Sequence, residues 1–415
     1  MRCPARYAAR LSQAFTATDS ALSIRPENML VIPDIITTGT DGQLRYCFTD
    51  GVGTLSPGLA RAIWGELRAK GRRVGHASTY PRLFQIRLGG SKGMLSVDYQ
   101  LKGLTVALRP SMIKFEAPHS LSIEIARAFD RPSRYLLNRP QIMLLENLGV
   151  PYEVFKALQD TAVRDVQRAV DSLDMAAHTL EAHGLGASFR LSSTMRSLHR
   201  LGVGSFTEDI SWQRMMNFAV NHVLRELKHH ARIPVPNGWT LVGVADHHKY
   251  LKENEIFACV DDPDGEGVIY LEGPIMITRS PAIHPGDIQM VHAIGKPPPG
   301  SPLARGLLKN GVVFAANGMC HGYRILSTRI WCKTDMPPGR RPVSTCLGGG
   351  DLDGDVYNLT PMTELHPSKT YEPAAYEPAK RKVLDRESTM VDVANFVTDY
   401  ITSNVSITSS VDPCT

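Results

Sequence analysis

The first 150 residues alternate between short apolar runs and turn-forming pairs such as Gly-Gly, Lys-Gly and Arg-Pro, a pattern typical of β-strands. One helix is expected among them, because Leu59, Ile63 and Leu67 recur at helical spacing. Ser56 and Pro57 just before them suit the N-cap and the first helical position. The strands expected in this part are Leu83–Leu88, Gly93–Val97 and Leu104–Leu108.

The apolar period becomes helical after Pro140. One apolar stripe between Pro151 and Gly184 predicts a helix over Tyr152–His183, and a second stripe predicts a helix over about Phe206–Arg232.

The strand pattern returns after Pro234–Pro236. The layout is therefore a β-rich unit, a helical connector and a second β-rich unit, an α+β fold in which two similar β units suggest duplication. The strands expected in the second unit are Thr240–Val244, Ile256–Val260, Gly267–Thr278, Asp287–Ile294 and Gly311–Ala315.

The length and composition narrow the class of protein. The 415 residues suit two or three domains, and 43% hydrophobic and 21% charged residues exclude disorder, collagen and coiled coil for the whole chain. The best apolar run, Val268–Thr278, is broken by Glu272, Gly273 and Pro274, so we expect a soluble protein that does not enter a membrane. Seven scattered cysteines without a C-x-x-C pair argue against a disulfide framework and a structural zinc site, and for a reducing compartment.

Positive charge is concentrated between Arg61 and Phe115. This stretch has eleven basic residues against Glu66 and Asp98, a local charge of +9 in a chain whose net charge is +5. Such a local excess is what a surface that binds phosphates requires, although a solubilising face has the same composition. The basic residues are Arg61, Arg68, Lys70, Arg72, Arg73, Arg82, Arg87, Lys92, Lys102, Arg109 and Lys114.

The strongest local motif is the segment Gly348–Asp355, which reads G-G-G-D-L-D-G-D and precedes an apolar strand-like run. Asp351, Asp353 and Asp355 repel one another unless a cation offsets their charge, and Gly354 allows the backbone to turn so that the three side chains converge. Carboxylates alone suit Mg²⁺, with Mn²⁺ as the alternative.

The motif has other interpretations. An EF-hand needs Gly at the sixth and Glu at the twelfth position, where this chain has Val356 and Met362. The acidic segment Asp262–Gly267 also lacks the final ligand, since its twelfth position is Gly273, and we interpret it as a hairpin turn. A solvated acidic turn, or an acidic Ca²⁺-binding β protein, remains an alternative.

Nucleotidyl transfer combines these two features. It uses an acidic divalent-metal site together with cations around a triphosphate. The segment Arg109–Phe115 is the sharpest candidate for the cations, because Pro110 sets a rigid turn that holds Arg109 close to Lys114.

Several ordered motifs resemble the cellular RNA-dependent RNA polymerases of eukaryotic RNA silencing. The D-L-D-G-D loop is similar to their catalytic loop, and the resemblance runs from about Cys3 to Leu359 and weakly through Tyr371–Tyr400. Where the family has an acidic Asp-Glu-Thr pattern, this chain has Asp246, His247 and His248, and Met319–Pro338 is an extra segment. The other matching segments are Cys3–Arg10, Phe48–Thr54, Gly89–Gly93, Arg109–Phe115, Leu137–Pro140, Leu145–Pro151 and Arg279–Asp287.

The resemblance implies two double-psi β-barrels joined by helices. It assigns residues 1–150 to a first, basic barrel region, 151–232 to the helical connector, 233–362 to a second barrel with the acidic loop, and 363–415 to the truncated start of a helical region. By position, Asp351, Asp353 and Asp355 would bind the metals. The residues that would face triphosphate or RNA are Lys92, Arg109, Lys114 and Arg139.

The resemblance also implies a function. It predicts RNA-directed RNA synthesis from NTPs on a single-stranded template by two-metal catalysis, in the production of double-stranded RNA and siRNA, with silencing proteins as further partners. An intracellular location, cytoplasmic or nuclear and without a signal peptide, follows, and the basic Met1–Thr18 segment is then part of the polymerase core instead of a transit peptide. The alternative is a catalytically inactive fragment that only binds RNA.

Overall fold

The structure is a computed structural model of the chain. It describes residues 2–13, 15–38, 45–70, 80–117, 119–186, 191–203, 208–262, 267–316, 322–326, 330–334, 341–376 and 382–409. Arg72, Arg73, most of the acidic hairpin turn predicted at Asp262–Gly267 and much of the extra segment Met319–Pro338 lie outside the described residues. The chain divides into one unit of Met1–Asp19 with Ala375–Thr415 and a second unit of Ser20–Ala374.

The smaller unit is built on two helices, α1 (Pro4–Gln13) and α10 (Met390–Ser409), which contact each other. The amide of Leu384 donates a hydrogen bond of 2.8 Å to the carbonyl of Arg2, which ties the two segments of this unit together. Arg386 and Asp392 form a double ion pair with N–O distances of 2.6 and 2.9 Å just before and within the first turn of α10.

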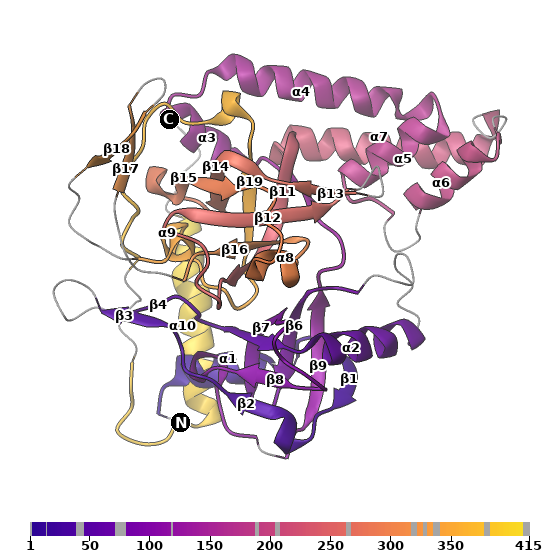
Figure 1. Ribbon diagram of the computed structural model, residues 1–415. Coiled ribbons are helices and arrows are strands. Elements are labelled where there is room, and N and C mark those ends of the chain that lie inside the picture. The colour runs from indigo at the N-terminus through magenta and orange to yellow at the C-terminus, as the bar shows by residue number, and fades with distance from the viewer. Residues whose placement is uncertain are drawn as a thin grey trace. The chain divides into compact units, whose positions relative to one another are not determined.

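The larger unit begins with a sheet of seven strands in the order β1-β9-β6-β7-β5-β8-β2 (Figure 1). Helix α2 (Pro57–Ala69) starts as predicted, because the hydroxyl of Ser56 accepts a hydrogen bond from the amide of Leu59 at 3.1 Å. A separate hairpin joins β3 (Ile36–Thr38) and β4 (Arg45–Cys47). The strands of the sheet are β1 (Asp19–Ser23), β2 (Met29–Val31), β5 (Val52–Leu55), β6 (Leu83–Leu88), β7 (Ser91–Val97), β8 (Val106–Leu108) and β9 (Ser122–Ala128).

The helical part contains more breaks than the apolar stripe predicts. A single helix over Tyr152–His183 is wrong, because the chain turns at Asp171 and starts a new helix at Ser172, whose hydroxyl accepts from the amide of Met175 at 3.2 Å. The apolar stripe continues across this break because the helix before Ser172 and the helix after it both bury apolar residues. The helices are α3 (Arg139–Asn147), α4 (Tyr152–Gln167), α5 (Leu173–Ala182), α6 (Leu191–Arg200) and α7 (Ile210–His230), of which α6 was not predicted.

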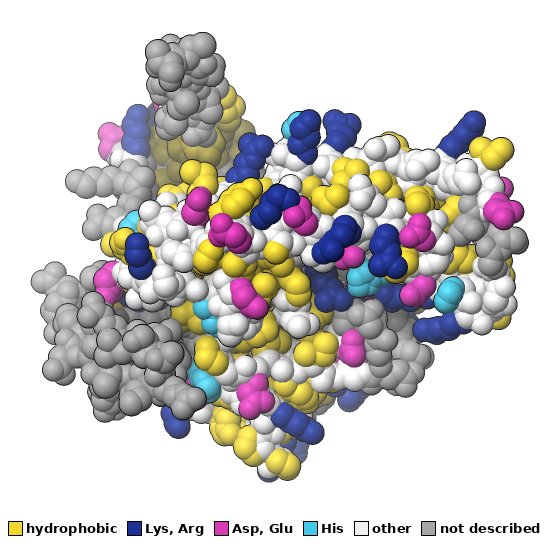
Figure 2. Space-filling model, turned by 90° about the horizontal axis from the view of Figure 1, so that it is seen from above, with side chains coloured by type: hydrophobic (Ala, Val, Ile, Leu, Met, Phe, Trp, Pro, Cys, Tyr) yellow, Lys and Arg dark blue, Asp and Glu magenta, His cyan; other side chains and the backbone are white. Residues whose placement is uncertain are grey.

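The surface that these helices present mixes charges of both signs (Figure 2). Lys156 and Asp160 form an ion pair along α4, and Arg168 and Asp171 form another at 3.8 Å. This face therefore lacks the one-sided positive charge of the Arg61–Phe115 stretch. In the described part of the chain, no helix is long and apolar enough to cross a bilayer.

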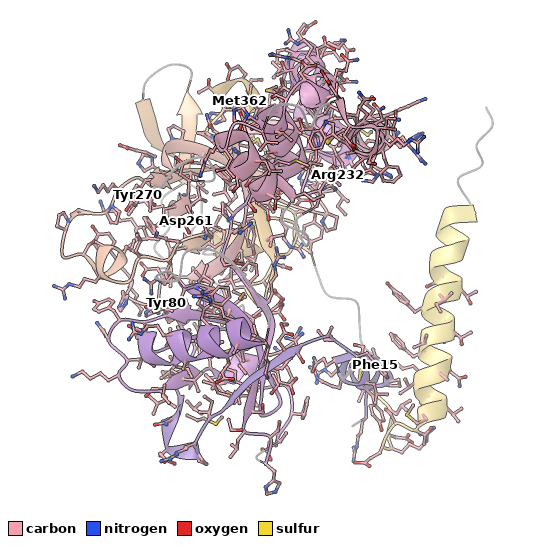
Figure 3. All side chains as sticks on the ribbon, turned by 90° about the vertical axis from the view of Figure 1, so that its right-hand side faces the viewer. Phe15, Tyr80, Arg232, Asp261, Tyr270 and Met362 are labelled. Carbon is pink, nitrogen blue, oxygen red and sulfur yellow. The ribbon has the colours of Figure 1, made fainter. Side chains whose placement is uncertain are left out.

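His183, just after α5, makes the stability of this part depend on pH. Burial, followed by the positive charges of Arg232 (labelled in Figure 3), His178 and His222, lowers the pKa of His183 from 6.5 to about 4. The unfolded chain binds a proton at this histidine near pH 6.5, and the folded chain binds it only near pH 4. The free energy of unfolding is therefore highest above pH 6.5 and decreases as the pH falls from 6.5 to 4.

We expect this histidine to cost the wild type about 2 kcal/mol of unfolding free energy between pH 8 and pH 5. The His183→Gln variant should lose that much less, and urea unfolding at both pH values measures the difference. His292→Gln, which changes an exposed histidine, is the matched control. An equal pH-dependent loss in the wild type and in His183→Gln would contradict the assignment.

The second sheet closes on itself. Strands β11, β16, β12, β15, β14 and β19 pair in that order, and β19 pairs again with β11, so six strands form a barrel of mixed direction. Strand β10 (Ser133–Leu136) pairs with β11 at the outside, and β13 (Val268–Tyr270) pairs with β12. The barrel strands are β11 (Pro234–Ala245), β12 (Glu255–Asp261), β14 (Glu272–Arg279), β15 (Ile288–Ile294), β16 (Gly311–Phe314) and β19 (Val356–Thr360).

The strand predictions for this region are confirmed except for Gly267–Thr278, which is two strands separated at Leu271. A further hairpin joins β17 (Gly322–Leu326) and β18 (Ile330–Thr334). Short helices α8 (Pro302–Arg305) and α9 (Val343–Cys346) complete the region.

One apolar core joins the two sheets. Leu83 of β6 belongs to the same buried cluster as Val242 of β11, and a side chain at Gly311 would collide with Leu83. On the first sheet, the Arg82 guanidinium lies 3.8 Å from the ring centre of Tyr80, which Figure 3 labels. The observed fold is thus α+β and β-rich, and its two sheets are held together by a continuous core.

Candidate active site at the acidic loop

The segment Gly348–Asp355, which we call the acidic loop, links α9 to barrel strand β19. Gly348, Gly349 and Gly354 have φ values of 61°, 65° and 135°, which L-residues rarely adopt. Leu352 is 2% exposed and anchors the loop in the core between the sheets. The glycines and this one apolar anchor therefore produce a tight turn that leaves the acidic side chains at its edge.

Carboxylates and backbone amides brace the acidic loop internally. The amide of Asp353 donates to Oδ1 of Asp351 at 3.1 Å, and the amide of Asp351 donates to Oδ2 of Asp355 at 3.0 Å. The hydroxyl of buried Tyr357 donates to the carbonyl of Asp351 at 2.7 Å. These bonds orient the carboxylates of Asp351 and Asp355 before any ligand arrives.

Two cations from different strands neutralise part of this charge. Lys92, near the start of β7 in the first sheet, places Nζ 2.6 Å from Oδ2 of Asp353. Arg279, at the end of β14, places Nε 2.7 Å from Oδ2 of Asp355. Since all four side chains are 20–28% exposed, the cluster is open to solvent and to a ligand.

The pKa values of Asp351 and Asp353 are shifted in opposite directions. Burial, and then the negative charges of Asp353 and Asp355, raise the pKa of Asp351 to about 7. Burial would also raise the pKa of Asp353, but the hydrogen bond and charge of Lys92 lower it below the ordinary value. The charged form is therefore disfavoured at Asp351 and favoured at Asp353.

The fit to a divalent ion can be tested on this donor set. It consists of carboxylate oxygens and is partly exposed, as Mg²⁺ requires. Asp351 and Asp353 approach each other, whereas Arg279 holds the carboxylate of Asp355. Within the described residues, the three acidic-loop carboxylates do not bring one oxygen each within 4.8 Å of one another. The convergence expected from the glycine turn is therefore seen for two of the three.

The basic residues predicted for this site are placed unequally. Lys114 is near the acidic cluster, since its charge lowers the pKa of Asp353, and its Nζ donates to the carbonyl of Ser111. Arg109 is 5% exposed, and its guanidinium donates to the carbonyl of Pro33. Arg139 is exposed at the start of α3, and in the part of the chain that the structure describes no hydrogen bond or ion pair joins it to the acidic loop.

The burial of Arg109 affects its charge. Burial is the main cause that lowers the pKa of Arg109, and the negative charge of Asp34 acts in the opposite direction. Asp34 in turn accepts hydrogen bonds from the amide and hydroxyl of Ser111 at 2.9 and 2.8 Å. The Pro33–Asp34 segment thus bonds both Arg109 and Ser111 in the turn that carries Lys114.

Four further residues contact or face the acidic loop and are not among the predicted site residues. Gln85 of β6 donates from Nε2 to the carbonyl of Asp353 at 3.1 Å. Arg87 lies two positions along the same strand, and the negative charge of Asp353 acts to raise its pKa against the effect of burial. The alternation of β6 places both on one face and could have identified them. The other two are Asp50, whose pKa is raised by burial, and Arg279.

The Phe48–Thr54 segment packs closely against the acidic loop. A Cβ added to Gly51, which has a φ of 78°, would lie 2.5 Å from Cβ of Asp353. The amide of Gly51 donates to the hydroxyl of Ser111 at 3.1 Å, and a side chain at Gly93 would strike the carbonyl of Gly51. This glycine contact lets the first sheet reach the acidic residues of the barrel.

The chain is thus a β-rich α+β protein with an acidic loop on a closed barrel, and Lys92 and Lys114 from the first part of the chain lie near that loop. The sequence model of the family RNA dependent RNA polymerase matches residues 1–410. The chain belongs to this RNA-dependent RNA polymerase family.

Relatives agree with this assignment. RNA-dependent RNA polymerase 1 of Arabidopsis thaliana is 31% identical over 411 residues, which is 97% of this chain and 33% of that protein. RNA-dependent RNA polymerase 1 of Schizosaccharomyces pombe is 27% identical over 95% of this chain and 31% of its own length. The chain spans about a third of the length of these relatives.

A solved structure shares the fold. The RNA dependent RNA polymerase QDE-1 from Thielavia terrestris matches 91% of this chain and 40% of its own, with a TM-score of 0.67 and 19% sequence identity.

Proposed function

We propose that this chain is the catalytic core of an RNA-directed RNA polymerase, which adds nucleotides from NTPs to RNA on a single-stranded RNA template. The observation that carries the proposal is the contact between Lys92 of the first sheet and Asp353 of the acidic loop, at 2.6 Å. This contact places a lysine, which can bind phosphate, beside a carboxylate, which can bind a metal ion. The reaction itself is inferred from membership of the RNA-dependent RNA polymerase family.

The proposed architecture is two double-psi β-barrels with the boundaries expected from the sequence: residues 1–150, a connector of 151–232, residues 233–362, and a helical region from 363. Similar strand pairing supports it. In the first sheet β5 runs parallel to β7 while β6 runs antiparallel to it, and in the second β11 runs parallel to β16 while β12 runs antiparallel to it.

The reaction joins a 3′-hydroxyl to the α-phosphorus of an NTP and releases pyrophosphate. Asp351, Asp353 and Asp355 would hold Mg²⁺, or Mn²⁺ in its place, which lowers the pKa of the attacking hydroxyl and stabilises charge on the phosphate oxygens. Lys92 already favours the charged form of Asp353, and Arg279 and the amide of Asp351 orient the carboxylate of Asp355.

The cations of the first sheet are proposed to bind phosphate. Lys92, Lys114 and Arg87 face the acidic loop from one sheet and would neutralise the triphosphate as negative charge develops. Arg109 would position Lys114 through the Pro33–Asp34 segment. Arg139, which is exposed at the start of α3, would contact the RNA backbone.

The biological role follows from the family. We propose that the products are double-stranded RNA and then siRNA in RNA silencing, that the enzyme acts in the cytoplasm or nucleus, and that silencing proteins are its further partners.

The test is incorporation of a labelled ribonucleotide on single-stranded RNA by the purified chain. We expect incorporation that requires Mg²⁺ and all template-complementary NTPs, and its loss when EDTA removes the metal. Tight, salt-sensitive RNA binding without Mg²⁺-dependent incorporation would instead support the inactive RNA-binding alternative.

A further inference from the structure

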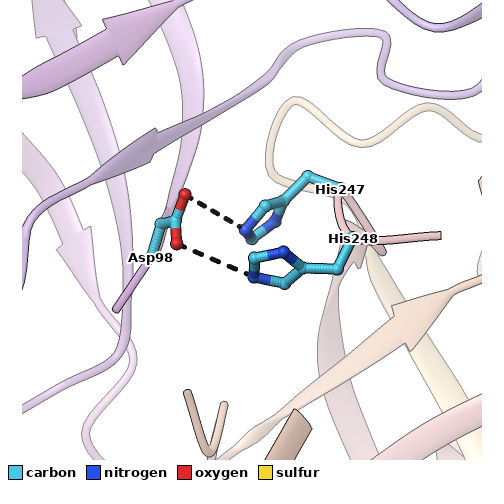
Figure 4. Close-up of side chains that lie close together, drawn as sticks. All are labelled: Asp98, His247 and His248. Carbon is cyan, nitrogen blue, oxygen red and sulfur yellow. Dashed lines mark ion pairs between the residues drawn. The ribbon is translucent and has the colours of Figure 1, made fainter. Parts of the chain in front are cut away.

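A second cluster of potential metal ligands lies apart from the acidic loop. It consists of Asp98, which directly follows β7 in the first sheet, with His247 and His248, which follow β11 of the barrel (Figure 4). We propose that these three side chains form a site for a divalent transition-metal ion, and that the bound ion is Zn²⁺.

The distances suit a tetrahedral ion. Nε2 of His247 is 3.5 Å from Oδ2 of Asp98, and Nε2 of His248 is 3.7 Å from Oδ1. Zn–ligand bonds of 2.0–2.1 Å place tetrahedral ligands about 3.3–3.4 Å apart. One ligand atom from each residue lies within 4.8 Å of the other two. Small side-chain movements would therefore complete the geometry.

The two imidazoles also share one side of their loop, which adjacent residues of a strand cannot do. Asp246, 1% exposed, enforces this by accepting hydrogen bonds from the amides of His248 at 3.1 Å and Leu251 at 2.7 Å. Lys249 adopts a left-handed φ of 55° in the same turn. The ring centres of His247 and His248 are consequently 4.0 Å apart.

The polar atoms of the cluster are incompletely satisfied by the protein. Nε2 of His247 is buried and, among the described residues, makes no hydrogen bond of ordinary geometry. A small cavity lined by His247, His248, Val97 and Leu303 lies beside it. A buried nitrogen without a hydrogen bond of good geometry costs free energy, and a metal ion with a water as fourth ligand would satisfy it.

The donor types select the ion. Imidazole nitrogens favour Zn²⁺ and other transition metals, whereas Mg²⁺ prefers oxygen alone. The lack of paired cysteines argues against a cysteine-based zinc site, and this cluster needs none. Bound Zn²⁺ would connect β7, which carries Lys92, to β11. Strand β11 pairs with β19, the strand that follows the acidic loop.

Titration of the full chain with Co²⁺ in excess Mg²⁺ tests the proposal, because Mg²⁺ occupies oxygen-only sites such as the acidic loop. We expect one Co²⁺ per chain with the intense visible absorption of a tetrahedral centre, displacement by Zn²⁺, and a Zn²⁺-dependent rise in Tm of at least about 3 °C. A folded wild-type chain without this absorption or stoichiometry would overturn the proposal, whatever the variants do.

Substitutions locate the ion. Asp98→Asn, His247→Ala and His248→Ala should each weaken Zn²⁺ binding by more than the roughly 10–100-fold that loss of an outer contact to a metal ligand costs. His292→Ala, at an exposed histidine of β15, should bind as the wild type does. Circular dichroism identifies any variant that is unfolded, and undiminished binding by the folded His247→Ala and His248→Ala chains would refute the site.

Discussion

We expect Asp353→Asn to abolish Mg²⁺-dependent ribonucleotide incorporation, with a loss of about 1,000-fold or more. The substitution keeps the size of the side chain but removes the charge that would bind the metal, and metal-ion stabilisation of transferring phosphates is worth several kcal/mol. It also leaves Lys92 without its carboxylate partner at 2.6 Å. Single-nucleotide extension of a primed RNA template under saturating NTP measures the loss.

Asp261→Asn is the matched control for this variant. Asp261 lies on β12 of the same barrel and forms a comparable ion pair with Lys309, with an N–O distance of 2.8 Å. We expect it to retain wild-type incorporation. Near wild-type activity of a folded Asp353→Asn chain would show that this carboxylate does not hold a metal during the reaction, and the polymerase site would have to lie elsewhere.

Local signals in the sequence predict most strands of the barrel, three of the seven strands of the first sheet and the start of α2. Strand β6 has the predicted bounds because its alternation and flanking turns are contained within a few residues. Helix α2 begins at Pro57 because Ser56 caps it locally. The break at Ser172 is local too, but the apolar stripe continues across it and conceals the capping serine.

The site depends on contacts that no local pattern encodes. Arg279 meets Asp355 because β14 pairs with β19 when the barrel closes. The position of Arg109 in a rigid turn is evident in the sequence, but its burial against Pro33 depends on how distant segments pack. Asp98 and the two histidines likewise come together only through the packing of one sheet on the other. The sequence therefore predicts the chemistry of the acidic loop better than its neighbours.

The contact between Gly51 and the acidic loop leads to the second large effect. We expect Gly51→Ala to reduce incorporation by at least about 100-fold, because the new methyl group would lie 2.5 Å from Cβ of Asp353 and 3.0 Å from its Cα. Reacting groups displaced by about 1 Å typically lose this much rate. The positive φ of 78° adds a backbone cost of about 1–2 kcal/mol.

Gly103→Ala separates these two causes. Gly103 has a φ of 64°, so alanine meets a similar backbone cost there, but its added Cβ would have no heavy atom within 4 Å. We expect both variants to lower the urea midpoint, and only Gly51→Ala to lose incorporation under conditions where both are folded. Equal activity of the two folded variants would mean that the Phe48–Thr54 segment does not set the position of Asp353. A selective loss in Gly51→Ala would mean that the first sheet positions the acidic loop by direct backbone contact, which requires glycine at this point.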